Sequence, residues 1–126
     1  MAYRYLATDE LVALQRLLGG SGDVRGETLE RVAARPALAA HYDNADLIRQ
    51  AALLMAGLVW ERPFTAGNRR LALAAGDAFI VLNGFSLAAD PLDLADQLVA
   101  LARAATFDEA ADTLDAWLRR RIRFDG

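Results

Sequence analysis

A chain of 126 residues, of which 55% are hydrophobic and 25% charged, has the size and composition of one globular domain and not of a disordered protein. The lack of cysteine excludes disulfides and thiolate sites, and a single histidine, His41, excludes a multi-histidine metal centre. A net charge of −3 argues against a domain that coats nucleic acid, and all 14 basic residues are arginine, which excludes lysine chemistry.

No secretory or membrane segment is expected. The longest apolar run, residues 51–60, is about half of the roughly 20 residues that a bilayer requires. We therefore expect a cytoplasmic protein in which this run is a buried helix.

The first helix is expected to begin at Thr8, whose side chain can cap it. The Gly-Gly-Ser-Gly run at 19–22 would end it. Its predicted buried stripe consists of four leucines: Leu11, Leu14, Leu17 and Leu18.

A second, shorter helix is predicted over 27–35. Pro36 should stop it, because proline disfavours helical geometry in the residue before it. Residues 36–44 have no clear period and are expected to form a loop, at the end of which Asn44 caps the next helix.

Two apolar helices are predicted in the middle of the chain, over 45–61 and 68–83. The first is apolar on nearly every side, which is typical of a helix packed by neighbours on several faces. Pro63 separates the two, and Asn83-Gly84 is a favourable helix end. The expected buried residues of the second helix are Leu71, Leu73, Ala74, Phe79, Ile80 and Leu82.

Residues 85–89 read as a linker before two more helices. Asp90-Pro91 is a strong helix start, and this helix should reach about residue 105. Thr106 and Glu109 have the spacing of a capping box that opens a last helix. Several arginines gather at the end of that helix, where they either favour the helix dipole or dock an acidic partner: Arg119, Arg120, Arg121 and Arg123.

Residues 61–70, Glu-Arg-Pro-Phe-Thr-Ala-Gly-Asn-Arg-Arg, are not explained by packing alone. A sharp loop with Gly67 leads into a helix that starts with Arg69 and Arg70, and arginine is the wrong charge for that end of a helix. A bound anion would explain both arginines, because the first N–H groups of a helix attract phosphate. Ion pairs with Glu61 or Asp77 are the alternative explanation.

At these residues the chain resembles the Fic/Doc (Fido) family, and its death-on-curing (Doc) toxin branch more closely. The likeness rests on Pro-Phe-x-x-Gly-Asn-x-Arg, followed by Leu-Ala-Leu-Ala-x-x-x-x-Phe. Further matches run in order along nearly the whole chain: Tyr5-Leu6, Val24-Arg25, Ala34-Arg35-Pro36 and Leu82-Asn83-Gly84-Phe85.

The resemblance implies a compact helical domain that binds a nucleoside triphosphate and transfers a nucleotidyl or phosphoryl group to a protein hydroxyl. It implies a phosphate cradle at Gly67, Asn68 and Arg69, with Arg70 on the phosphate oxygens and Phe64 as a buried pin of the loop. Residues 36–44 would lie where the family has a flap that aligns the target.

The chain departs from the family pattern at two positions. The family's general base, a histidine, is replaced by Arg62, which stays protonated and cannot accept a proton. The family's Mg²⁺-binding acid or amide is replaced by Ala66, which offers no ligand. An engineered change would explain Arg62 but not Ala66. His41 would lie in the flap, either exposed to solvent or close enough to act as a base.

We therefore expect an all-α Fic/Doc-like bundle of about six helices in one domain, 1–126. The expected protein is a Doc-like member of a toxin–antitoxin system that keeps an anion-binding turn and has weak or lost catalysis. ATP or another nucleotide is the expected ligand, and Mg²⁺ has little support. The expected partners are an antitoxin and a target protein of the translation machinery, with no direct nucleic acid or membrane contact. The alternatives are an active transferase that uses Arg62 in place of the base or metal, and a ligand-free interaction module.

Overall fold

A computed structural model describes residues 2–20 and 22–126, and its described part contains six helices and two short strands, which confirms the all-α prediction. In chain order the elements are α1 (Thr8–Leu17), α2 (Gly26–Asp43), α3 (Leu47–Glu61), α4 (Asn68–Leu82), β1 (Phe85–Leu87), α5 (Pro91–Leu101), α6 (Phe107–Arg119) and β2 (Ile122–Phe124).

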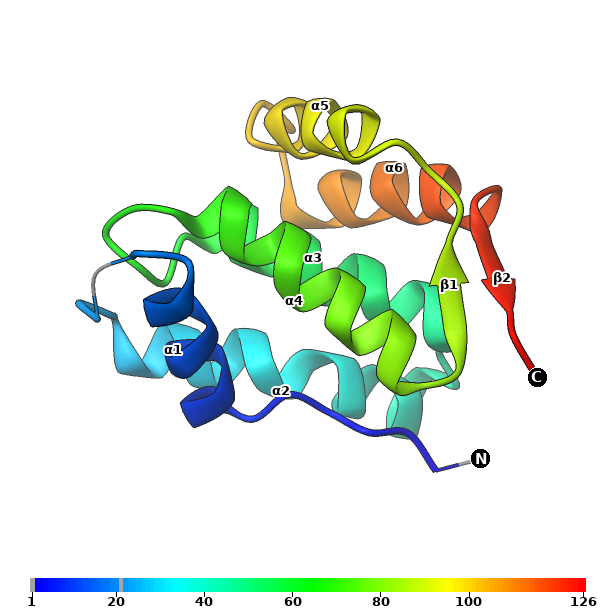
Figure 1. Cartoon of the computed structure of the whole chain (residues 1–126), viewed down its shortest axis with the longest axis horizontal. Helices are drawn as coiled ribbons and strands as arrows, with labels where there is room; N and C mark the ends of the chain where they lie inside the picture. Colours follow the sequence, from blue (N-terminus) through cyan, green and yellow to red (C-terminus); the bar gives the residue numbers. More distant parts are fainter. Residues whose placement is uncertain (1, 21) are drawn as a thin grey trace.

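Helix α3 lies at the centre of the fold, as its apolar sequence predicts. It packs against α2, α4 and α6, and all its residues from Gln50 to Val59 are buried. In Figure 1, α1 and α2 lie on one side of the α3–α4 pair, and α5 and α6 lie on the other. The loop between α3 and α4 therefore connects the two most deeply packed helices. No helix in the described ranges has the length and hydropathy needed to cross a bilayer.

Helix α2 overturns the prediction of a loop, and hence of a flap, over residues 36–44. The helix continues through Pro36 to Asp43, and Asn44 ends it in a left-handed conformation instead of capping the next helix. Pro36 and Ala39 are buried, so their packing offsets the helical hydrogen bond that proline cannot make. The cap of α3 is Asp46, whose side chain accepts a hydrogen bond from Arg49 N–H at 2.9 Å.

Helix α1 is rotated relative to its predicted orientation. Leu17 is 83% exposed, whereas Gln15 is completely buried on the same face as Leu11. Its N-cap is Ala7 and not Thr8, and Glu10 accepts a hydrogen bond from Ala7 N–H at 2.9 Å. A glutamine thus occupies a core position of the helix nearest the α3–α4 loop.

The C-terminal region confirms both predicted helix starts. Asp90 accepts a hydrogen bond from Leu92 N–H at 2.8 Å, and Thr106 accepts one from Glu109 N–H at 3.1 Å. The last helix stops at Arg119, and the chain then forms β2, which pairs antiparallel with β1 and places Phe124 opposite Phe85. Neither strand was predicted, because each has only three residues.

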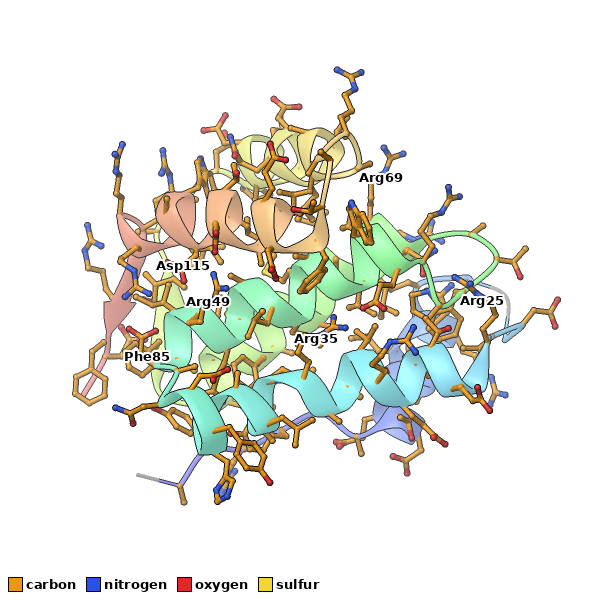
Figure 2. The ribbon with its side chains drawn as sticks, turned by 180° about the vertical axis from the view of Figure 1, so that it is seen from behind. Arg25, Arg35, Arg49, Arg69, Phe85 and Asp115 are labelled. Carbon is orange, nitrogen blue, oxygen red and sulfur yellow. The ribbon has the colours of Figure 1, made fainter. Side chains whose placement is uncertain are left out.

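Arg119 has a structural role. Its guanidinium contacts Asp46 at 2.7 Å and Asp115 at 2.9 Å, so it ties the end of α6 to the start of α3. Arg49 extends this link with ion pairs to Asp112 at 2.8 Å and Asp115 at 3.7 Å. Figure 2 shows Arg49 and Asp115 close together between α3 and α6. These contacts fix the bundle on the side away from the α3–α4 loop.

Candidate functional site

The loop between α3 and α4, residues 62–67, is held at its start by an arginine from the neighbouring segment. Arg62 ends α3 in a left-handed conformation with φ of 51°. The guanidinium Nη2 of Arg25 donates to the carbonyl oxygens of Glu61 and Arg62, the latter at 2.7 Å. The backbone from which the Arg62 side chain projects is therefore fixed.

The segment before α2 pairs with this loop like a short strand. Arg25 N–H donates to Pro63 O at 2.8 Å, Thr65 N–H donates to Asp23 O at 3.3 Å, and Val24 forms an antiparallel bridge with Phe64. The loop is thus ordered before any ligand arrives, which lowers the entropic cost of binding.

Asn68 fastens the loop to the first turn of α4. Its side-chain Oδ1 accepts from Phe64 N–H at 3.0 Å, and its Nδ2 donates to Phe64 O at 2.8 Å. Asn68 is 6% exposed and Phe64 is 2% exposed. The side-chain oxygen and nitrogen of Asn68 therefore both form their hydrogen bonds in the protein interior. The amide of Asn68 therefore shapes the loop, and the contribution of Asn68 to phosphate binding would come from its backbone N–H.

Gln15 is a site residue that the sequence analysis missed. Its Nε2 donates to Ala66 O at 2.9 Å, while its buried Oε1 has no hydrogen-bond partner within the described part of the chain. A polar residue four positions after Leu11, inside the apolar stripe of an amphipathic helix, is the signal that could have identified it.

Gly67 is the position where the loop turns tightly enough to require glycine. Its φ is 81°, and a Cβ atom there would lie 3.2 Å from both Gln15 Nε2 and Arg70 Nη2. A side chain would be strained by the backbone conformation and crowded by both neighbours. Because Arg70 Nη2 is so close to this point, its guanidinium lies over the turn.

The predicted site residues line one cavity of about 690 Å³ between the loop, the start of α4 and α5. Arg62, Gly67, Asn68, Arg69 and Arg70 all belong to its lining, and Figure 2 shows Arg69 at the start of α4. Phe64 lies beneath them in the core. An apolar wall completes this motif cavity: Val59, Leu73, Ala95, Leu98, Val99 and Ala102.

The three arginines of the motif cavity have no carboxylate partner. Among residues 2–20 and 22–126, no aspartate or glutamate lies within 4.0 Å of the guanidinium nitrogens of Arg62, Arg69 or Arg70. The alternative in which Glu61 pairs with Arg69 or Arg70 is therefore wrong. Glu61 instead pairs with Arg31 at 2.9 Å and with Arg35 at 2.6 Å. Figure 2 shows Arg35 between α2 and α3.

These ion pairs make the fold sensitive to acid. Burial alone would raise the pKa of Glu61, but its contacts with Arg35 and Arg31 outweigh burial and lower the pKa below its ordinary value. A carboxylate with a lowered pKa in the folded state stabilises the fold above the unfolded-state pKa. This stabilisation is lost as the pH falls through the folded-state pKa.

Glu61→Gln is therefore expected to lower the free energy of unfolding by about 1–2 kcal/mol at pH 7 and to lose less stability than the parent on acidification. Urea unfolding at pH 7 and pH 3 measures both effects. Glu30→Gln, at an exposed position of α2, is the matched control. Equal stability losses for both variants at pH 7 would contradict the prediction.

His41 lies far from the motif cavity, so the proposal that it replaces the missing base is wrong. It is exposed in the last turn of α2, and the start of α2 is the end that touches the loop. The 15 residues from Gly26 to His41 span about 22 Å of helix. His41 belongs instead to a separate pocket with Tyr3, Tyr5 and Asn44.

The residues of the motif cavity do not fit a divalent metal ion. Mg²⁺ binds oxygen ligands, usually including a carboxylate, whereas the lining contains three arginines and no acid. In the described ranges, no group of three or more histidine or acidic residues is placed to hold a metal ion.

The model of one protein family, described as the Fic/DOC family, matches residues 5–80. This region runs from before α1 nearly to the end of α4 and includes the whole loop. No curated protein matches the chain.

Proposed function

Because the chain belongs to the Fic/Doc family, we propose that it is a Doc-like protein that binds a nucleotide in the motif cavity and has weak or lost transferase activity. The observation that carries this proposal is a set of three guanidinium groups around one cavity with an apolar wall, none of which has a carboxylate partner among the described residues. Such a cavity suits a ligand with an anionic end and a flat apolar part, and its volume is ordinary for a small-molecule site.

The phosphates would lie at the start of α4. The first three residues of that helix line the cavity, and the first N–H groups of a helix favour anions. Arg70 can bind phosphate oxygens through two parallel hydrogen bonds. The apolar residues of α5 would contact the base. Gly67 allows the backbone to approach the ligand closely.

Weak catalysis is proposed because no histidine, aspartate or glutamate is among the described residues that line the cavity, so none of them offers a general base. By the resemblance, Arg62 takes the position of the family histidine, and a guanidinium group is not a general base. Losing a general base typically lowers a rate by roughly 10²–10⁴-fold. The proposed cellular role is that of a toxin-family protein beside an antitoxin. In that role it would act by binding a nucleotide, an antitoxin segment or a target of the translation machinery.

Calorimetry with ADP and ATP at low salt tests nucleotide binding. The parent should bind, and Arg70→Gln should weaken binding by about 10–100-fold, the value of a charge-assisted hydrogen bond. Arg120→Gln removes the same charge from an exposed position after α6 and should leave binding unchanged. The absence of heat with any nucleotide or inorganic phosphate would contradict the proposal and leave a ligand-free interaction module.

An active transferase is the second candidate, because Arg62 lines the same cavity as Arg69 and Arg70. A guanidinium there could stabilise charge on a transferring phosphoryl group. This candidate predicts labelled nucleotide transfer to a protein in lysate and growth arrest on induction, both lost in Arg70→Gln. Nucleotide binding without label transfer or a growth defect would instead support the degenerate site.

A further inference from the structure

The oxygen atoms of the α3–α4 loop are nearly all bonded inside the protein. The Glu61 and Arg62 carbonyls accept from Arg25 Nη2, and Pro63 O accepts from Arg25 N–H. Phe64 O accepts from Asn68, Ala66 O from Gln15, and Gly67 O from Leu71 N–H. Of the backbone carbonyls from 61 to 67, only that of Thr65 has no such bond among the described residues.

Of the two side-chain oxygens of the lining, Asn68 Oδ1 accepts from Phe64 N–H inside the protein. The Thr65 hydroxyl donates to Asp23 O at 3.5 Å, so the Thr65 oxygens are the acceptors that remain on this lining. The cavity therefore presents N–H donors and guanidinium groups to a ligand, and little that could replace the oxygen ligands of a hard cation.

We infer that the motif cavity binds nucleotide polyphosphate in its metal-free form and that Mg²⁺ weakens this binding. This inference rests on the proposed function, and it specifies that the bound nucleotide is the form without Mg²⁺. A polyphosphate carries two more negative charges when free than when bound to Mg²⁺, so three arginines attract the free form more strongly. A cation between the phosphates and the guanidiniums would also face three like charges.

Arg62 is the residue that gives the cavity this preference. Its backbone has a left-handed conformation, and Arg25 donates hydrogen bonds to the carbonyl of Arg62 and to that of the preceding Glu61. The side chain of Arg62, which lines the cavity, therefore extends from a fixed backbone. It adds a third cation to the pair at the start of α4. We expect it to interact with the same phosphate oxygens that a metal ion would otherwise bind.

The test compares ADP binding to the full chain in excess EDTA and in saturating Mg²⁺ at matched ionic strength, because screening changes with salt. Calorimetry should give a dissociation constant about 5–10-fold lower in EDTA. Inorganic pyrophosphate should show the same preference but bind more weakly than ADP, since it lacks the part that contacts α5.

Arg62→Asn tests the role of the third cation, and asparagine is among the residues that tolerate a left-handed conformation. This variant should weaken ADP binding in EDTA by about 10-fold. It should also reduce the difference between the ADP dissociation constants in EDTA and in Mg²⁺. Arg120→Gln should change neither, and a thermal melt shows that both variants fold.

The outcomes separate this inference from the proposed function. Tighter ADP binding in Mg²⁺ than in EDTA would overturn the inference and leave nucleotide binding intact. Equal ADP affinity in EDTA and in Mg²⁺ would overturn the inference as well. So would an Arg62→Asn variant whose ADP dissociation constants in the two buffers differ as much as those of the parent. No binding of ADP or pyrophosphate in either buffer would overturn the proposed function and this inference together.

Discussion

Truncation of Phe64 to alanine is expected to lower the free energy of unfolding by about 3–5 kcal/mol, the usual cost of removing a buried aromatic ring. Phe64 is 2% exposed and belongs to the main core cluster, although it lies in a loop. A typical domain has about 5–15 kcal/mol of total stability, so the variant would lose a large share of it. Urea unfolding monitored by circular dichroism measures the loss.

The same truncation should also abolish nucleotide binding. Both backbone groups of Phe64 are bonded to Asn68, so a change in the position of Phe64 alters the start of α4. Phe64→Leu keeps most of the buried volume and should retain both the fold and part of the affinity. If Phe64→Ala does not fold, Phe64→Leu still tests whether the Phe64 side chain supports nucleotide binding.

Phe124→Ala is the matched control for ring removal. Phe124 is 64% exposed and packs on Phe85 at 5.0 Å between ring centroids. Its loss should cost about 0.5–1.5 kcal/mol and leave nucleotide binding unchanged. Similar stability losses for Phe64→Ala and Phe124→Ala would show that Phe64 does not pin the loop.

The fold was predictable from the sequence where local signals agree with packing. Asp90-Pro91 and Thr106 to Glu109 mark helix starts through their own side chains, and these starts lie where predicted. The apolar run of α3 predicts a central helix whatever surrounds it. In these cases the decisive interactions involve residues close together in the sequence.

Pro36 shows where local signals fail. Proline disfavours helix by about 3 kcal/mol in a helix interior, yet α2 continues through it because its buried face packs against α3. That packing depends on residues far along the chain, so the 36–44 segment alone could not reveal it. The prediction of a flap over these residues was wrong for the same reason, whereas His41 is exposed to solvent, as one of its two alternatives expected.

The candidate site was predictable as a set of residues but not as a set of roles. The sequence places Arg62, Gly67, Asn68 and Arg70 in one loop and turn, and the structure gathers them around one cavity. Asn68 also bonds Phe64, and Gln15 reaches the loop from 51 residues away. The Asn68 bonds are local, but they depend on the conformation of the loop, and the Gln15 bond is a tertiary contact. The sequence marks Gln15 as a polar residue in an apolar stripe, but it does not disclose the partner of either side chain.

The double substitution Arg62→His with Ala66→Asp is expected to restore Mg²⁺-dependent chemistry to the cavity. It places a proton acceptor and a carboxylate ligand at the two positions where we propose that the chain departs from the family pattern, and both positions line the cavity. Histidine is one of the residues enriched in the left-handed conformation that position 62 adopts. Transfer of labelled nucleotide to protein in lysate should rise by about 10²-fold or more over the parent.

Each single substitution should fail for a separate physical reason. Arg62→His alone supplies a base without a metal ligand, so the charge of the transferring group stays uncompensated. Ala66→Asp alone places a carboxylate beside three arginines, where ion pairing should occupy it and weaken nucleotide binding. In the double variant ADP should bind more tightly with Mg²⁺ than in EDTA, the reverse of the parent. Adding Arg70→Gln should remove the restored transfer. If the double variant binds nucleotide with Mg²⁺ but transfers no label, positions 62 and 66 do not account for the proposed loss of catalysis.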